Sequence, residues 1–164
     1  GYKVNVNLSV VQLLQPDIVE TIRQTLVETG VKPHNLTLEV TESLAINDME
    51  RMKEILTNIK GLGVRIALDD FGTGYSSLNH IREIPFDVIK VDQSFVRDLA
   101  EDAYSQSFIK MVAELAETIG VSICVEGIET EEQYRVLEGM KVRMVQGYYF
   151  DRPMPRKDFE KKYM

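Results

Sequence analysis

The sequence predicts an α/β fold in which parallel strands alternate with helices, and it favours a closed barrel over an open doubly wound sheet. Six apolar, strand-like runs are separated by segments with helical periodicity and helix-capping residues. Strands that are joined through helices pair in parallel, which leaves these two architectures as the main options. In five of the six runs, one alternate set of residues is apolar and the other set is polar or small. A strand covered on both faces would be apolar on both, so this pattern indicates a barrel with helices outside and a polar interior.

The predicted strands follow one another without a linker or low-complexity segment, so we expect a single domain over residues 1–164. They are expected over residues 3–8, 36–41, 64–69, 88–91, 121–125 and 142–146. The polar or small set, which would face the interior, comprises Asn5, Asn7, Thr37, Glu39, Arg65, Ala67, Asp69, Lys90, Asp92, Ser122, Cys124 and Glu126. The sixth strand breaks the rule, because Gln146 shares its parity with the apolar Val142 and Met144. Alternation therefore leaves the direction of the sixth strand open.

The predicted helices are recognised by the residues at their ends. Gly30 ends the first helix, because glycine readily adopts the left-handed conformation of a helix C-cap. Asn47, supported by Glu50 three residues on, begins the second helix, and Thr130 with Gln133 forms a capping box for a later one. Helices are expected over residues 17–29, 47–61, 104–119 and 130–140, with a short one after residue 155.

Length and composition are those of one globular domain with a real core, since the 164 residues are 44% hydrophobic and 27% charged. No apolar run approaches the roughly 18 residues of a membrane span and no secretion signal opens the chain, so we expect no membrane insertion by this segment and a cytoplasmic location. The single Cys124 lies in an apolar strand, which favours a buried, reduced thiol over a catalytic one. A formal charge of −7 argues against a nucleic-acid polymer as partner, whereas a small phosphate ester held through metal ions is permitted.

Two adjacent carboxylates, Asp69 and Asp70, end the third predicted strand and precede the turn Gly72-Thr73-Gly74. They would repel one another unless a cation or a shared proton offsets their charge. Oxygen ligands favour Mg²⁺, Mn²⁺ or Ca²⁺ over softer metals. Taken alone, the motif is equally well interpreted as a surface turn rich in Asp and Gly.

Polar residues also lie at or near the C-terminal ends of the other strands, and these are Asn7, Glu39, Lys90, Glu126 and Gln146. In α/β barrels this rim carries the active site. Together with Asp69 and Asp70, it supplies enough hard ligands for two divalent cations, which can activate a water and clamp the oxygens of a phosphoryl group. We expect Lys90 to stabilise charge on a phosphate or to hold the attacking water. The alternative is an edge-strand lysine that reaches out to water.

The chain resembles the EAL-domain cyclic di-GMP phosphodiesterases over essentially all of its length, with motifs in the family's order and spacing. These motifs are Asn7-Leu8-Ser9, Leu38-Glu39-Val40-Thr41-Glu42, Asp69-Asp70-Phe71-Gly72-Thr73-Gly74, Ile89-Lys90-Val91-Asp92, Glu126-Gly127-Ile128-Glu129 and Gln146-Gly147-Tyr148. The resemblance implies a TIM-type (β/α)8 barrel in modified form. It also implies binding of cyclic di-GMP and hydrolysis of one phosphodiester to linear pGpG with two divalent cations, Mg²⁺ or Mn²⁺.

The same resemblance implies a role for each motif residue. The implied metal ligands are Asn7, Glu39, Asp69, Asp70 and Glu126. Lys90 and Gln146 would orient the water and the substrate, so that catalysis would rest on these two residues with Asp70 and Glu126. Glu42 would tether the loop over residues 69–78, which must be ordered for Asp70 to bind a second metal.

One departure from the family is serious. The Glu-Ala-Leu signature, whose glutamate is a metal ligand in the family, has no counterpart because the chain begins beyond it. We therefore expect an N-terminally truncated domain with about six β/α units and two unpaired sheet edges. The isolated chain is expected to turn over substrate weakly or not at all.

Two other functions stay open on the sequence. The chain could be a degenerate receptor that binds cyclic di-GMP without cleaving it, or a regulatory or dimerising remnant that binds no nucleotide. A homodimer is an option in each case. The resemblance further implies an upstream sensor or GGDEF-type domain in the parent protein.

Overall fold

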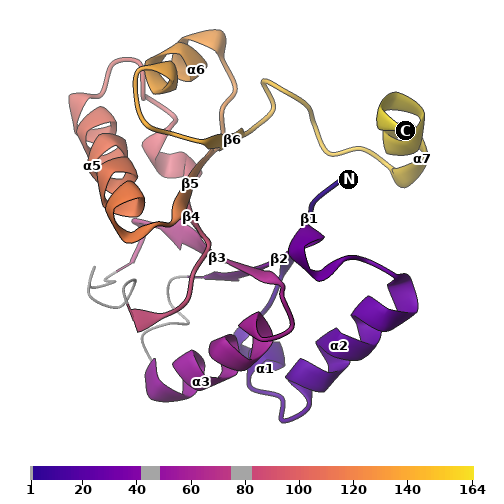
Figure 1. Cartoon of the computed structure of the whole chain (residues 1–164). Coiled ribbons are helices and arrows are strands. Elements are labelled where there is room, and N and C mark those ends of the chain that lie inside the picture. The colour runs from indigo at the N-terminus through magenta and orange to yellow at the C-terminus, as the bar shows by residue number, and fades with distance from the viewer. Residues whose placement is uncertain (1, 42–48, 75–82) are drawn as a thin grey trace.

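A single parallel sheet organises the molecule (Figure 1). The computed structural model describes residues 2–41, 49–74 and 83–164. Within them, six strands pair in chain order, each parallel to the next. A doubly wound sheet reverses its strand order at a switch point, whereas this order never reverses, so the structure is the predicted incomplete barrel. The strands are β1 Val4–Asn7, β2 Leu36–Thr41, β3 Arg65–Phe71, β4 Val88–Val91, β5 Ser122–Glu126 and β6 Met144–Gln146.

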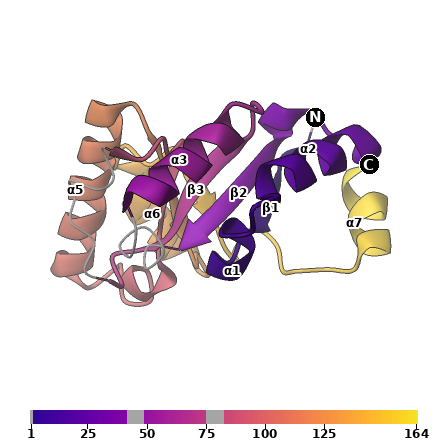
Figure 2. The same ribbon diagram turned by 90° about the horizontal axis from the view of Figure 1, so that it is seen from below.

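Among the described residues, helices join β1 to β2, β2 to β3, β4 to β5 and β5 to β6, and these helices cover the outer side of the sheet (Figure 2). The predicted helices are confirmed where the structure describes them, although the expected start at Asn47 lies outside the described residues. The short helix that Ser9 and Gln12 cap was not predicted, because four residues are too few to show a helical period. The elements are α1 Val10–Leu13, α2 Ile18–Thr29, α3 Met49–Lys60, α5 Ala103–Ile119, α6 Glu131–Glu138 and α7 Arg156–Tyr163, with 3-10 turns η1 Pro33–Asn35 and η3 Gln93–Phe95.

The main core lies between the outer face of the strands and the helices. It includes the apolar set that alternation assigned to that face in the central strands, namely Leu38, Val40, Ile66, Leu68, Ile89, Val91, Ile123 and Val125. Val4 and Val6 of β1 differ from the prediction, since they stay 49% and 45% exposed. β1 is the edge of the sheet, and the helices of the described residues leave this part of its outer face uncovered.

A second, smaller apolar cluster lies on the inner face and fixes the direction of β6. There Met144 packs against Ala67, Val88 and Cys124. Met144 pairs with Cys124 and Gln146 pairs with Glu126 across the parallel ladder, and paired residues share a face of the sheet. Gln146 therefore points to the same side as the predicted site residues.

The two termini lie side by side, at the open part of the barrel (Figure 2). The ring of Tyr2 packs edge-on against Phe159 of α7 at 5.7 Å, and its hydroxyl donates a hydrogen bond to the carbonyl of Tyr163. β1 and β6 have no strand partner on their outer edges among the residues the structure describes. Within the same residues, no helix is both long enough and apolar enough to cross a membrane.

Candidate metal and catalytic site

Four charged side chains meet on the inner face, near the C-terminal ends of the central strands. Glu39 comes from β2, Asp69 from β3, Lys90 from β4 and Glu126 from β5. Each belongs to the polar alternate set, so the strand geometry itself brings them together. The carboxyl ends of parallel strands form the rim at which α/β barrels carry their active sites.

Lys90 is the centre of this cluster. Its Nζ lies 2.7 Å from Glu39 Oε1, 2.7 Å from Glu126 Oε1 and 3.1 Å from Asp69 Oδ1. The side chain is only 5% exposed. The alternative of an edge-strand lysine is therefore wrong, because β4 is a central strand and the ammonium group is held inside the half-barrel.

Opposing effects act on the pKa of Lys90. Burial alone would lower the pKa of the ammonium group, but hydrogen bonds to Glu126 and Glu39 and the charges of Glu126 and Asp69 outweigh burial and raise the pKa. The lysine is therefore protonated throughout the physiological range. A protonated lysine that donates to Glu39 and Glu126 has no lone pair with which to act as a general base in this arrangement.

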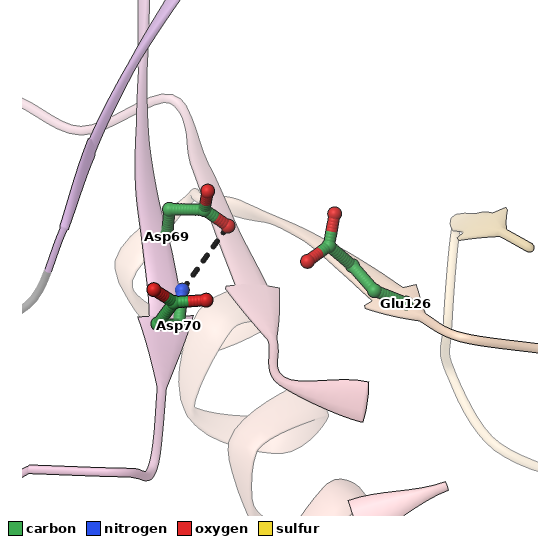
Figure 3. A group of neighbouring side chains, drawn as sticks. All are labelled: Asp69, Asp70 and Glu126. Atoms are coloured by element: carbon green, nitrogen blue, oxygen red, sulfur yellow. Dashed lines mark hydrogen bonds between the residues drawn. The ribbon is translucent and has the colours of Figure 1, made fainter. Parts of the chain in front are cut away.

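Asp69, Asp70 and Glu126 form a second grouping that overlaps the first. One carboxylate oxygen of each lies within 4.8 Å of the others, and Figure 3 shows the three side chains around a shared space. Asp70 reaches this position through a left-handed backbone with φ of 56°, which is uncommon for a residue other than glycine. Its N–H donates to Asp69 Oδ1 at 3.1 Å, the contact that is dashed in Figure 3.

The site carries more negative than positive charge. Burial raises the pKa of the Asp70 carboxyl, and neighbouring Asp69 raises it further. Burial also raises the pKa of Glu126, although the hydrogen bond from Lys90 opposes this. Glu39 and Asp69 also lie against Lys90, so the site sets four carboxylates, those of Glu39, Asp69, Asp70 and Glu126, against one ammonium group. A hard divalent cation fits this oxygen-only, negatively charged set, with Asp69, Asp70 and Glu126 as the residues that would hold it.

Close packing positions the turn that follows Asp70. At Gly72 the backbone has φ of 100°, and an added Cβ would lie 2.6 Å from the ring of Phe95. That ring stacks on Phe108 of α5 with centroids 4.1 Å apart. Thr73 Oγ1 donates to the carbonyl of Asp70 at 2.8 Å, which ties the turn back to the site residue.

Two predicted residues lie beside the cluster on the outer strands. Asn7 of β1 pairs with Glu39, and Gln146 of β6 pairs with Glu126, both in register. Both are exposed, since β1 and β6 are the open edges. Glu42, expected to tether the loop after β3, lies outside the described residues, so that role stays a prediction.

Sequence reasoning missed Asn5 as a member of the site. Its Nδ2 donates to Glu39 Oε1 at 2.7 Å, on the same oxygen that faces Lys90. The available signal was parity, because Asn5 precedes Asn7 by two residues on the inner face of one strand. An amide donor on Glu39 fixes the carboxylate for the neighbouring ammonium group.

Comparison with known proteins gives a consistent result. A family model described as the EAL domain matches residues 1–153. The bifunctional diguanylate cyclase/cyclic di-GMP phosphodiesterase MucR of Pseudomonas aeruginosa is 36% identical over 154 residues, which is 94% of this chain and 22% of MucR. The structure of the MucR phosphodiesterase in complex with c-di-GMP superimposes with a TM-score of 0.90 at 36% identity, over 96% of this chain and 64% of that one. A manganese and cyclic di-GMP complex of Klebsiella pneumoniae BlrP1 gives a TM-score of 0.86 at 32% identity, over 92% of this chain and 39% of that one.

The chain spans about a fifth of the length of the curated relatives it matches. Within that span, the family match includes all six strands and every strand end that carries a predicted site residue. The fold agrees with that of the MucR phosphodiesterase structure. This chain therefore belongs to the EAL domain family.

Proposed function

We propose that this chain is the larger part of a phosphodiesterase domain that hydrolyses cyclic di-GMP to linear pGpG with two divalent cations, Mg²⁺ or Mn²⁺. The observation that carries the proposal is the convergence of Glu39, Asp69 and Glu126 on the buried Lys90, with Asp70 beside them. A charge surplus of this kind, on a barrel rim, suits a cation and a phosphate ester together. Two relatives of this chain support cyclic di-GMP as the substrate, since the MucR and BlrP1 structures hold that nucleotide.

Each of seven candidate site residues has a role in this proposal. Bound divalent cations would supply an activated water and charge neutralisation on the phosphoryl oxygens. Asn7, Glu39, Asp69, Asp70 and Glu126 are the proposed metal ligands. Lys90 donates an N–H to the water or to a phosphoryl oxygen, and the Gln146 amide, beside Glu126 in the ladder, orients the substrate. Hydrolysis of one phosphodiester consumes one water and opens the ring, which leaves a phosphomonoester and a ribose hydroxyl at the two ends of linear pGpG.

The proposal includes two further β/α units that complete the barrel before β1. The open edges of β1 and β6 support this, as does coverage of only 64% of the MucR phosphodiesterase chain. A complete barrel of this kind has about 250 residues. We therefore expect the 164-residue chain alone to turn over cyclic di-GMP weakly or not at all.

The test compares the chain alone with a fusion in which the missing units of the MucR phosphodiesterase domain precede Gly1. Both are incubated with Mn²⁺ and cyclic di-GMP, and pGpG is quantified by ion-exchange chromatography. We expect the fusion to be at least about 100-fold faster, because it regains a complete set of ligands around the reacting phosphate. Full turnover by the chain alone would contradict the need for further units.

Calorimetry on the same two proteins distinguishes an enzyme from a receptor. Nucleotide affinity that does not depend on metal, with no pGpG from the fusion, would favour a cyclic di-GMP receptor. Absence of nucleotide binding by both proteins would favour a regulatory or dimerising module. A Glu126→Gln fusion that binds nucleotide but releases no pGpG completes the set, because it separates loss of chemistry from loss of fold.

A further inference from the structure

Three carboxylates surround the Lys90 ammonium, which is as many as it has N–H donors. An ammonium group has three donors and no acceptor, and Nζ has carboxylate oxygens of Glu39, Asp69 and Glu126 at 2.7 to 3.1 Å. The side chain is 5% exposed, so water cannot supply a substitute. In this arrangement Lys90 has no N–H left for a water or a phosphoryl oxygen.

Two of these carboxylates belong to both groupings of the site. Asp69 and Glu126 form ion pairs with Lys90 and also form the candidate metal group with Asp70, whose three members are drawn in Figure 3. A carboxylate oxygen cannot serve a metal ion and a lysine at full strength at once, and two cations held in one small cluster repel each other. The lysine and a metal ion therefore compete for the same oxygens.

We propose that Lys90 is an internal counter-ion that holds the carboxylate cluster together before metal binding and gives up part of it afterwards, which frees an N–H for the substrate. The first half follows from the contacts of the chain alone. The second half rests on the proposed function. Lys90 thus couples metal binding to the assembly of the reactive site, because the donor becomes available only when the metal is present.

The first half accounts for how the surplus of negative charge is tolerated in a folded chain. Glu39 is 7% exposed and Lys90 is 4% exposed, and a buried carboxylate without a partner is strongly unfavourable. Asn5 adds a neutral donor to Glu39 but no charge. Lys90 is the cation that contacts three of the four carboxylates, so replacing it should lower the stability of the chain most in the absence of metal.

The test compares Lys90→Met with Lys110→Met by thermal unfolding of the full chain in EDTA and in Mn²⁺. Methionine keeps most of the length of the side chain and removes the charge, and Lys110 is an exposed lysine of α5 that serves as the matched control. In EDTA we expect Lys90→Met to lower Tm by about 10 °C, whereas Lys110→Met shifts Tm by about 1 °C or less. In Mn²⁺ most of the deficit of Lys90→Met should disappear, and its Mn²⁺ affinity should be about 10-fold tighter than that of the wild type, because a competing positive charge is gone.

Two other results would overturn the proposal. If Lys90 is only a substrate-contacting residue, Lys90→Met leaves Tm in EDTA unchanged. If Lys90 only supports the fold, Tm falls equally in EDTA and in Mn²⁺, and Mn²⁺ affinity does not rise.

A measurement on the wild-type chain keeps the proposal testable if Lys90→Met does not fold. In EDTA, the Lys90 ammonium should give a slowly exchanging resonance in ¹H–¹⁵N spectra of lysine side chains, since all three protons are bonded and buried. Addition of Mg²⁺ should broaden or shift that resonance while the backbone amide of Asp70 reports binding. An unchanged Lys90 signal at Mg²⁺ saturation overturns the exchange of partners. An unchanged Asp70 amide shows instead that the proposed metal site is wrong, and a Lys90 ammonium that exchanges rapidly in EDTA overturns the counter-ion half.

Discussion

The two ends of the half-barrel both place a lysine against carboxylates, but with opposite charge balance. At the N-terminal end, Lys60 Nζ contacts both oxygens of Asp87 at 2.6 and 2.7 Å, and Asp87 also accepts the N–H of Ile66 at 2.8 Å. That pair is complete in itself, with one positive and one negative group. At the C-terminal end, a single ammonium group faces four carboxylates.

This difference shows which feature of a charged cluster points to a ligand. Charge alone does not, because both ends have buried or half-buried ion pairs. A balanced pair that also satisfies a backbone N–H stabilises the sheet and needs nothing further. A surplus of carboxylates that the chain itself does not neutralise is stable only with an additional cation or additional protons. The excess of carboxylates over positive charge therefore identifies the C-terminal end of the half-barrel as the candidate ligand site.

The largest expected effect on stability compares the two glycines that flank β3. Gly72, at the C-terminal end, has φ of 100° and an added Cβ would lie 2.6 Å from Phe95, whereas Gly63, at the N-terminal end, has φ of 84° and would meet only Pro33 Cβ at 3.4 Å. We expect Gly72→Ala to lower the free energy of unfolding by about 3–4 kcal/mol, from backbone strain plus overpacking. Gly63→Ala should cost about 1–2 kcal/mol from strain alone. Urea unfolding of both variants measures the difference, and equal losses would show that the turn after Asp70 is not held by the aromatic stack.

The next effect concerns metal affinity and is confined to one end. Glu126→Gln keeps an acceptor for Lys90 but removes a charge from the candidate metal group, and we expect Mn²⁺ affinity to fall at least about 100-fold. Glu138→Gln, an exposed glutamate at the end of α6, is the matched control and should leave Mn²⁺ affinity unchanged. Calorimetric titration with Mn²⁺ provides both values. Retained affinity in Glu126→Gln would remove Glu126 from the proposed ligand set.

Removing one carboxylate should have opposite signs at the two ends. Asp87→Asn breaks a balanced pair that is 24–31% exposed, and we expect it to lower the free energy of unfolding by about 1–2 kcal/mol. Asp70→Asn removes surplus charge, and asparagine tolerates the left-handed backbone at that position, so in EDTA it should raise the free energy of unfolding by about 0.5 kcal/mol after solvent screening. Urea unfolding at pH 7 in EDTA measures both. Destabilisation by Asp70→Asn would mean that the C-terminal end is balanced in a way the contacts do not show.

Which residues face each side of the sheet was predicted well, because the alternation of apolar and polar residues reflects burial directly. Residues such as Glu39, Lys90 and Glu126 could be placed on one face and at one rim from their spacing alone. β6 escaped this reasoning because Met144 is apolar and yet points inward, where it packs on Ala67, Val88 and Cys124. The inner face below the rim carries both these apolar side chains and polar ones such as Thr37 and Arg65, so polarity alone does not assign every residue to a face.

The contacts within the site could not be predicted from spacing. Strand parity indicates that Lys90 faces inward, but its three ion pairs depend on strand twist and on the register shift between β3 and β4 near Leu68 and Phe71. β3 also continues two residues beyond the predicted end, because pairing with β4 resumes at Phe71, after the irregularity that contains Asp70 with its φ of 56°. In the same way, alternation showed which face Val4 and Val6 occupy but not whether a helix covers that face.

The smallest effect concerns Cys124, which pairs with Lys90 in the ladder and lies between the two ends. Burial raises the pKa of its thiol from 9.0 to about 12, and the nearby Glu126 carboxylate adds to this while Lys90 opposes it. In the unfolded chain the thiol ionises near pH 9, whereas in the folded chain it keeps its proton until about pH 12. The unfolded state therefore binds fewer protons in this window, so stability falls as pH rises through it, by about 0.8 kcal/mol between pH 8 and pH 9.5.

Cys124→Ala should remove that part of the pH dependence. Urea unfolding at pH 8 and pH 9.5 gives the change in unfolding free energy for each protein, and this change should be smaller in Cys124→Ala than in the wild type. Iodoacetamide at pH 8.5 gives an independent check, since the native thiol should react at least about 100-fold more slowly than the unfolded one. Rapid labelling of the native chain would show that water and small solutes reach the interior through the open edges of β1 and β6. In that case the charge surplus at the rim would be screened by solvent, and the contrast between the two ends would weaken accordingly.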